Sequence, residues 1–123
     1  MIHYLSARVR SFGYAIRGIG TLIATQPHAR LHLLATIVVT GAGIYLHLRR
    51  WEWVAILLCI GMVWMAEALN TAIEFLADEV TLERRERIKH AKDVAAGGVL
   101  ITALVSVAVG VLVFLNHLGS HLH

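Results

Sequence analysis

The sequence is poor in features on which soluble and secreted domains depend. It contains one cysteine and one proline in 123 residues, and only 15% of the residues are charged. A single cysteine excludes an intrachain disulfide, and a soluble domain of this length would carry about a quarter charged residues. Because 58% of the residues are hydrophobic, we expect a single integral-membrane domain, residues 1–123.

Basic blocks and phosphate-binding loops are also missing from the sequence. No run of lysine and arginine with interleaved aromatic residues occurs, so we expect no nucleic-acid partner. No GxxxxGK[ST] motif occurs, so a nucleotide site would have to be of another kind. We interpret the end of the sequence as a short polar tail with three scattered histidines, which are His117, His121 and His123. Their spacing indicates neither a tag nor a strong metal site.

Apolar periodicity predicts an all-α membrane protein with one surface helix and three spanning helices. Over residues 3–24, apolar side chains recur every three or four positions and basic ones lie opposite them. This pattern is typical of an amphipathic helix that lies along a membrane surface. Three apolar runs are about long enough to cross a bilayer as helices, and they lie at about 28–48, 53–77 and 94–118.

The breaks between these segments carry their own signals. Pro27 suits the first turn of a helix, with Thr25 or Gln26 as its cap. Residues 49–53 read Arg-Arg-Trp-Glu-Trp, which indicates a tight turn at a membrane interface. Residues 78–93 are highly charged and are expected to form a connector.

The distribution of basic residues predicts the orientation in the membrane. Nine of the eleven lie on one side of the predicted spans, and only Arg49 and Arg50 lie on the other. Because basic loops stay in the cytoplasm, we expect a multi-pass membrane protein with a cytoplasmic N-terminus. The nine are Arg8, Arg10, Arg17, Arg30, Arg84, Arg85, Arg87, Lys89 and Lys92.

One polar stripe interrupts the second apolar run. Glu67, Asn70, Glu74 and Asp78 follow each other at spacings of three, four and four, so they share one face of a helix. Acidic residues inside a membrane span are energetically costly and mark a functional site by default. The stripe runs toward the predicted cytoplasmic side, where ATP and magnesium are available.

The stripe has the residue types that phosphoryl transfer requires. Glu67 lies deepest in the apolar run, where a carboxyl group can serve as general base for a buried hydroxyl. Glu74 and Asp78 lie nearer the rim, and carboxylates there suit Mg²⁺ that keeps water and phosphate ligands. Lys92 and Asp93 add a cation and an acid at the mouth of the third span. Together they indicate phosphoryl transfer from ATP to a lipid hydroxyl.

Other interpretations remain open for single residues and for the whole chain. Asp78 would also be explained as an ordinary acid at the membrane interface. Asn70 would be explained by a hydrogen bond between helices, and Lys92 as an anchor at the cytoplasmic face. As a different class of function, a small multispan transporter subunit would use Glu67 as its proton or cation site. Such a subunit has no need for the further polar residues that converge on one face of the membrane.

The stripe and the start of the third span resemble the signature of the small bacterial diacylglycerol kinase and undecaprenol kinase family. The resemblance covers nearly the whole chain, because the surface helix, the three spans and the connector occur in the family's order. The matching residues read Glu67-Ala-Leu-Asn70-Thr71-Ala72-Ile73-Glu74-x-x-x-Asp78 and then Ala91-Lys92-Asp93-Val94-Ala95-Ala96-Gly97.

The resemblance implies a homotrimer with composite sites between subunits, and a role for each matching residue. Glu67 matches the catalytic base and contacts the lipid substrate, and Glu74 matches a magnesium ligand. Arg10 and Arg17 match basic positions near the site, where they would help to bind substrate. Six positions match residues of the nucleotide site: Tyr14, Asn70, Glu74, Asp78, Lys92 and Asp93. Glu74 belongs to this set because the magnesium that it would bind contacts the nucleotide phosphates.

The chain departs from the family at one metal position. Where the family usually has a glutamate before the first span, this sequence has Gln26, which offers a carbonyl oxygen without charge. The expected effect is weaker metal binding at this position. For the substrate, residues 30–34 and 92–97 look more like the undecaprenol kinase branch, so we favour undecaprenol over diacylglycerol.

Overall fold

The computed structural model describes residues 1–121, which form four helices. Three of them are long and apolar enough to cross a membrane by length and composition. The expected all-α fold with three candidate spans is therefore confirmed, whereas the surface position of the first helix and the trimer stay predictions. The helices are α1 (Ile2–Thr25), α2 (Pro27–Leu46), α3 (Arg50–Val80) and α4 (Glu86–His121).

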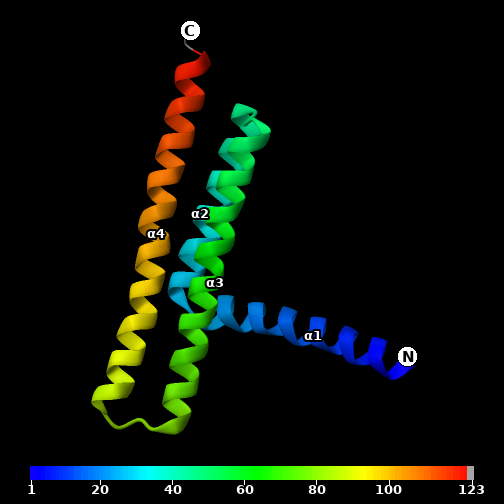
Figure 1. The fold of residues 1–123 in the computed structure, drawn as a ribbon, viewed down its shortest axis with the longest axis vertical. Coiled ribbons are helices and arrows are strands. Elements are labelled where there is room, and N and C mark those ends of the chain that lie inside the picture. The colour runs from blue at the N-terminus through cyan, green and yellow to red at the C-terminus, as the bar shows by residue number, and fades with distance from the viewer. Residues whose placement is uncertain (122–123) are drawn as a thin grey trace.

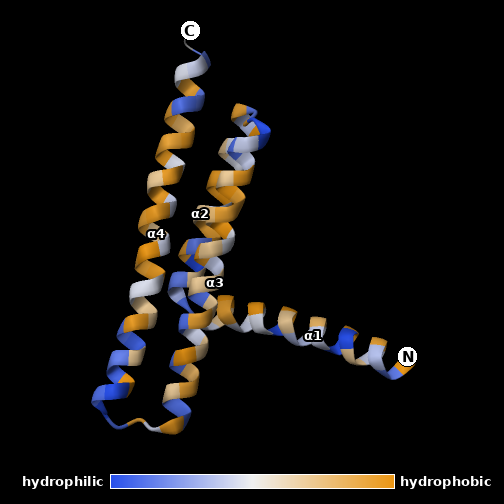
Figure 2. Ribbon diagram, in the orientation of Figure 1, coloured by the Kyte–Doolittle hydropathy of each residue, from blue (hydrophilic) through white to orange (hydrophobic). Residues whose placement is uncertain are grey.

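The three long helices form a bundle from which α1 projects. α3 and α4 lie side by side as a long antiparallel hairpin, and α2 packs against α3 (Figure 1). α1 leaves the bundle near its middle and points away across the direction of the other helices. Hydrophobic residues cover the central parts of the three long helices, and hydrophilic residues gather at the connection between α3 and α4 (Figure 2).

The break between α1 and α2 is set by Gln26 and Pro27. Gln26 has an extended backbone, and Pro27 is the first residue of α2, where its missing N–H group costs no helical hydrogen bond. Gln26 takes the N-cap position without a side-chain cap bond. Arg30 stabilises the corner instead, because its guanidinium donates to the carbonyl oxygens of Ile23 and Ala24 at 3.1 and 2.9 Å. A cation at a helix C-terminus is favourable there.

The turn between α2 and α3 is shorter than expected. His47 has a left-handed backbone with a φ of 55°, and α3 begins at Arg50, so residues 51–53 belong to the helix. Glu52 explains the early start, since its carboxylate accepts the N–H of Arg49 at 2.8 Å and thereby caps α3. Gly43 permits the close approach of the two helices, because a Cβ there would lie 2.7 Å from the ring of Trp53.

The charged connector is also mostly helical. Residues 78–93 were expected to link the second and third spans, yet only residues 81–85 lie outside the helices. The glutamate, lysine, arginine and alanine residues of this segment are good helix formers. The helices therefore continue beyond the ends of the apolar runs.

The core lies in the half of the bundle away from the α3–α4 connection. Its buried apolar residues are Leu48, Ile56 and Val113, and half-buried side chains such as Trp53 and Phe114 pack around them. The outward faces of the long helices expose large apolar side chains throughout. Such surfaces suit lipid or neighbouring chains, because backbone polar groups are already paired within the helices.

Candidate functional site

Glu67 is the most deeply buried member of the predicted stripe. It lies near the middle of α3 with 2% of its surface exposed. Its Oε2 lies 3.5 Å from Nε2 of His32, which comes from α2. The sequence pattern did not indicate this partner for Glu67. A buried carboxyl group needs a polar neighbour, and the fold brings one from another helix.

His32 is itself held at the interface of α2 and α3. Its ring meets the ring of Trp64 edge to face, with 6.4 Å between the centroids. Trp64 donates its indole N–H to the hydroxyl of Thr36 at 3.0 Å, and this hydroxyl donates to the carbonyl oxygen of His32 at 2.7 Å. The imidazole therefore faces Glu67 from a supported position.

Asn70 and Glu74 supply the oxygen atoms of the next two turns. The Asn70 amide donates to Glu74 Oε1 at 3.4 Å, while Oδ1 of Asn70 is buried without a hydrogen-bond partner. A carboxylate beside an unpaired carbonyl oxygen suits a hard divalent cation. Among residues 1–121, no three His, Cys, Asp or Glu side chains gather closely enough to hold a metal by themselves. A metal at this site therefore needs ligands from phosphate, water or another chain.

The loop end of the α3–α4 hairpin carries two exposed ion pairs. Lys92 donates to Asp78 at 2.7 Å between the two helices, and Lys89 donates to Asp93 at 2.8 Å within α4. These side chains line a polar cavity of about 300 Å³. Exposed ion pairs of this kind contribute about 0–1 kcal/mol, so either lysine can turn to an incoming phosphate at little cost.

The predicted positions on α1 lie apart from the stripe. Tyr14, Arg10 and Arg17 are exposed, and the guanidinium of Arg17 lies 5.2 Å from the centre of the Tyr14 ring. α1 meets α3 through an apolar surface that includes Leu22 and Phe75. Within residues 1–121, no hydrogen bond or ion pair links the three predicted side chains to the stripe.

Gln26 is also separate from the stripe within one chain. Its side-chain amide donates to the hydroxyl of Thr25 at 3.2 Å. No hydrogen bond joins it to Glu74 in the part of the chain that the structure describes. Of the ten predicted site residues, six lie on α3 and α4. The structure brings Asn70 to Glu74 and Lys92 to Asp78, and it places Asp93 in the same cavity as Asp78 and Lys92. Glu67 contacts α2 instead, through His32.

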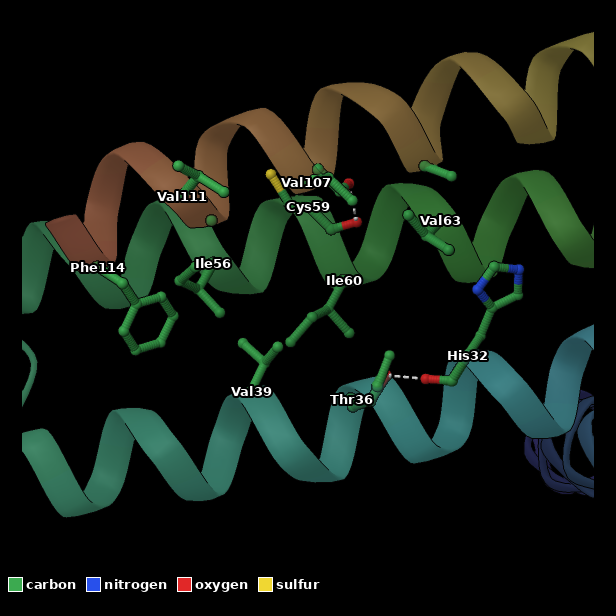
Figure 3. A pocket seen from close by; sticks show the side chains of 14 residues that line it. His32, Thr36, Val39, Ile56, Cys59, Ile60, Val63, Val107, Val111 and Phe114 are labelled. Atoms are coloured by element: carbon green, nitrogen blue, oxygen red, sulfur yellow. Dashed lines mark hydrogen bonds between the residues drawn. The ribbon is translucent and has the colours of Figure 1, made fainter.

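An apolar cavity of about 400 Å³ lies between α2, α3 and α4. His32 and Thr36 lie at one end and Phe114 at the other (Figure 3). Between them the lining side chains are almost all apolar, and they include Val39, Ile60 and Val107. The cavity therefore offers hydrocarbon-compatible space that reaches the histidine next to Glu67.

Sequence reasoning missed a second buried acid. Glu52 and His117 are both almost fully buried, and His117 Nδ1 lies 2.8 Å from Glu52 Oε1. His117 Nε2 lies 2.7 Å from the carbonyl oxygen of Leu46. The expected polar tail is therefore wrong for His117, which lies on the packed face of α4, while His123 lies outside the described residues. The sequence did contain a signal for this pair. Glu52 stands at the start of the second predicted span and His117 at the end of the third, and antiparallel spans bring these two ends together.

Comparison with known proteins identifies the family. A family model described as prokaryotic diacylglycerol kinase matches residues 13–114. Undecaprenol kinase of Bacillus subtilis is 38% identical over 109 residues, which cover 89% of this chain and 89% of that protein. Diacylglycerol kinase of Synechocystis is 39% identical over 101 residues, which cover 81% of this chain and 58% of that protein.

A more distant relative has the same extent as this chain. Diacylglycerol kinase of Escherichia coli K12 is 24% identical over 111 residues, which cover 90% of this chain and 91% of that protein. The family match spans α2 and α3 entirely and most of α1 and α4, so it includes the complete stripe. The chain therefore belongs to the prokaryotic diacylglycerol kinase family and is a lipid kinase.

Proposed function

We propose that the chain transfers the terminal phosphoryl group of ATP to the hydroxyl group of a membrane lipid alcohol, with undecaprenol preferred over diacylglycerol. The observation that carries this proposal is the burial of Glu67, which is 2% exposed and lies on the same helix face as Asn70 and Glu74. A buried base next to oxygen donors for a metal–nucleotide complex is the arrangement that lipid phosphorylation requires.

Glu67 acts as the general base. As the lipid oxygen bonds to the γ-phosphorus, its proton moves to the Glu67 carboxylate, and the bond from phosphorus to the ADP oxygen breaks. The burial of Glu67 keeps water away from the reacting atoms, which prevents hydrolysis of ATP from competing with transfer to the lipid. The apolar cavity next to His32 suits the hydrocarbon part of the lipid.

Glu74 would hold Mg²⁺, with Asn70 beside it as a further oxygen donor. The ion would supply neutralisation of charge on the phosphate oxygens. Lys92 leaves Asp78 and turns to the phosphates, and Asp78 and Asp93 remain to orient the polar part of the nucleotide. This exchange is feasible because the Lys92–Asp78 pair is exposed, with 37% and 51% of the two side chains accessible.

The residues of α1 complete the site in a homotrimer. α1 projects from its own bundle and leaves Tyr14, Arg10 and Arg17 exposed. In the assembled protein, these side chains contact the nucleotide and substrate at a neighbouring hairpin, and Gln26 approaches the metal. α1 lies along the membrane surface through its apolar face, which brings its basic residues to the level of the phosphates.

The charge distribution supports a site at the cytoplasmic face of the bacterial inner membrane. Nine of eleven basic residues lie in α1, at the start of α2 or in residues 84–92, and positive loops are retained in the cytoplasm. ATP is present on that side. Membership in a lipid kinase family accounts for the acids of α3, so a transporter function is not needed to explain them.

The lipid preference is supported by residues 30–34 and 92–97 and by the relative named undecaprenol kinase. Its test uses purified protein in mixed micelles with radiolabelled ATP and Mg²⁺. Undecaprenol and diacylglycerol are supplied at equal mole fractions in separate reactions. We expect label in both products and a kcat/KM about tenfold higher for undecaprenol. A higher value for diacylglycerol would overturn the preference, and no labelled lipid from either alcohol would overturn the kinase mechanism.

A further inference from the structure

We propose that His32 is a positioning residue that orients Glu67 for phosphoryl transfer. Its Nε2–H group holds Oε2 of Glu67, so that the second carboxylate oxygen faces the lipid hydroxyl. The proposal rests on the role of Glu67 as general base. His32 touches neither the nucleotide nor the transferred phosphoryl group, and it acts through the carboxylate alone.

The contact between His32 and Glu67 is close enough to orient the carboxylate and long enough to shorten when substrate binds. Nε2 of His32 and Oε2 of Glu67 are 3.5 Å apart, which is an ion-pair contact slightly longer than an ordinary hydrogen bond. Such contacts often tighten only when substrate is bound. A glutamate side chain has several rotatable bonds, so without a partner its carboxylate would take several positions. A misplacement of about 1 Å in a reacting group can cost about 100-fold in rate.

The position of His32 is fixed by neighbours that have no other evident task. Trp64 packs against its ring edge to face, and Thr36 bridges the Trp64 indole and the His32 carbonyl oxygen. The side chain is also 20% exposed at the end of the apolar cavity, whereas that of Glu67 is 3% exposed. His32 therefore lies where the buried carboxyl group and the cavity meet.

His32 is the ion-pair partner of Glu67 among the described residues. α4 presents uncharged side chains to the cavity beside His32, including Ser106 and Phe114. Arg30, two residues away, is directed to the carbonyl oxygens at the end of α1. The orientation of the Glu67 carboxylate therefore depends on His32.

The proposal has a signature in the choice of side chain at position 32. Glutamine keeps an N–H donor that can face the Glu67 carboxylate, whereas alanine removes the donor. A positioning role therefore lowers kcat in the alanine variant without changing KM for ATP, and glutamine restores kcat.

The experiment compares His32→Ala, His32→Gln, His28→Gln and Glu67→Gln in the full-length protein. Glutamine keeps an N–H donor but does not titrate. His28 is an exposed histidine one turn earlier on α2 and serves as the matched control. kcat and KM for ATP and for undecaprenol are measured in mixed micelles at one pH, and thermal unfolding and ATP binding report the folded state.

For His32→Ala we expect kcat to fall by about 10- to 100-fold, with KM for ATP unchanged. His32→Gln should recover most of the loss, and His28→Gln should match the parent. If His32→Ala does not fold, His32→Leu takes its place as a variant of similar size without a donor, and a parental kcat in His32→Leu overturns the proposal. His32→Ala with parental kcat, or His32→Gln as damaged as His32→Ala, also overturns it.

The parallel Glu67→Gln variant separates this inference from the proposed function. An active Glu67→Gln enzyme would show that Glu67 is not the base, and both ideas would fail. An inactive Glu67→Gln enzyme together with parental His32 variants would reject only the role of His32.

Discussion

Glu52 and Glu67 are both buried acids on α3, but their surroundings suit different tasks. Glu52 accepts hydrogen bonds from the Arg49 backbone and from His117, both at 2.8 Å. Both bonds of Glu52 go to Oε1, and its Oε2 is buried without a partner. Among the described residues, the ion-pair partner of Glu67 is His32, at 3.5 Å. Two short bonds fix Glu52 at a helix end, whereas the looser contact leaves the Glu67 carboxylate free to take up a proton from a substrate. The contrast supports Glu67 as the reactive acid.

At the same scale, Glu74→Ala tests the proposed metal site. Removal of the carboxylate should raise the magnesium concentration for half-maximal activity by about tenfold or more, since even the loss of a group that supports a ligand costs about 10- to 100-fold in metal affinity. The measurement is a magnesium titration at saturating lipid. Glu79→Ala is the matched control, because Glu79 is an exposed acid of the same helix. A Glu74→Ala curve that overlays the parent would show that Glu74 is not a ligand.

Gln26→Glu tests the departure from the family. A second carboxylate should hold magnesium more strongly than an amide oxygen, because hard cations favour charged oxygen atoms. We expect half-maximal activity at lower magnesium and unchanged or higher turnover. Repulsion between two acids in the metal-free site opposes this and would appear as an earlier loss of activity when the pH is lowered. Assays at two pH values separate the effects, and no change in either dependence would place Gln26 away from the metal.

At the scale of helices, the existence of each element could be predicted but its ends could not. Apolar periodicity indicates where a chain can cross a membrane, and the spans near 28–48, 53–77 and 94–118 lie within or close to α2, α3 and α4. α3 and α4 continue past these limits because capping at Glu52 and helix-forming charged residues extend them, whereas α2 ends at Leu46, before its predicted limit. These local forces are independent of hydrophobicity, so an apolar run does not reveal them.

His117 ties the ends of three helices together. Its ring nitrogens face the Glu52 carboxylate on α3 and the Leu46 carbonyl oxygen at the end of α2. Both neighbours are acceptors, so the ring bonds to both when each nitrogen carries a proton. Such a contact depends on packing between residues 65 positions apart, which explains why the sequence pattern did not indicate it.

His117→Ala should destabilise the bundle without harming the chemistry of the folded protein. Loss of the imidazole removes one of the two hydrogen bonds of the buried Glu52 carboxylate, which costs about 1–3 kcal/mol. The measurement is the thermal midpoint in detergent together with kcat per folded molecule. Asn116→Ala, an exposed neighbour on α4, is the control. An unchanged midpoint for His117→Ala would show that this pair does not hold the helix ends together.

At the scale of the whole molecule, the stripe was predictable and its partners were not. Helical geometry alone places Glu67, Asn70, Glu74 and Asp78 on one face, and the structure agrees. The pairing of Glu67 with His32, and of Asp78 with Lys92, requires the packing of α2 and α4 against α3. The positions on α1 were inferred from family resemblance, and a single chain leaves them exposed because the proposed site is shared between subunits.

The most direct test of this account is the turnover of Glu67→Gln. The parent and the variant are compared in mixed micelles that contain undecaprenol, magnesium and radiolabelled ATP, with ATP binding and oligomeric state measured on the same preparations. Loss of a positioned base costs about 100- to 10,000-fold in rate. We predict a loss of at least this size, with ATP binding and a trimer retained. A Glu67→Gln enzyme that keeps most of the parental turnover would contradict the assignment of Glu67 as the base.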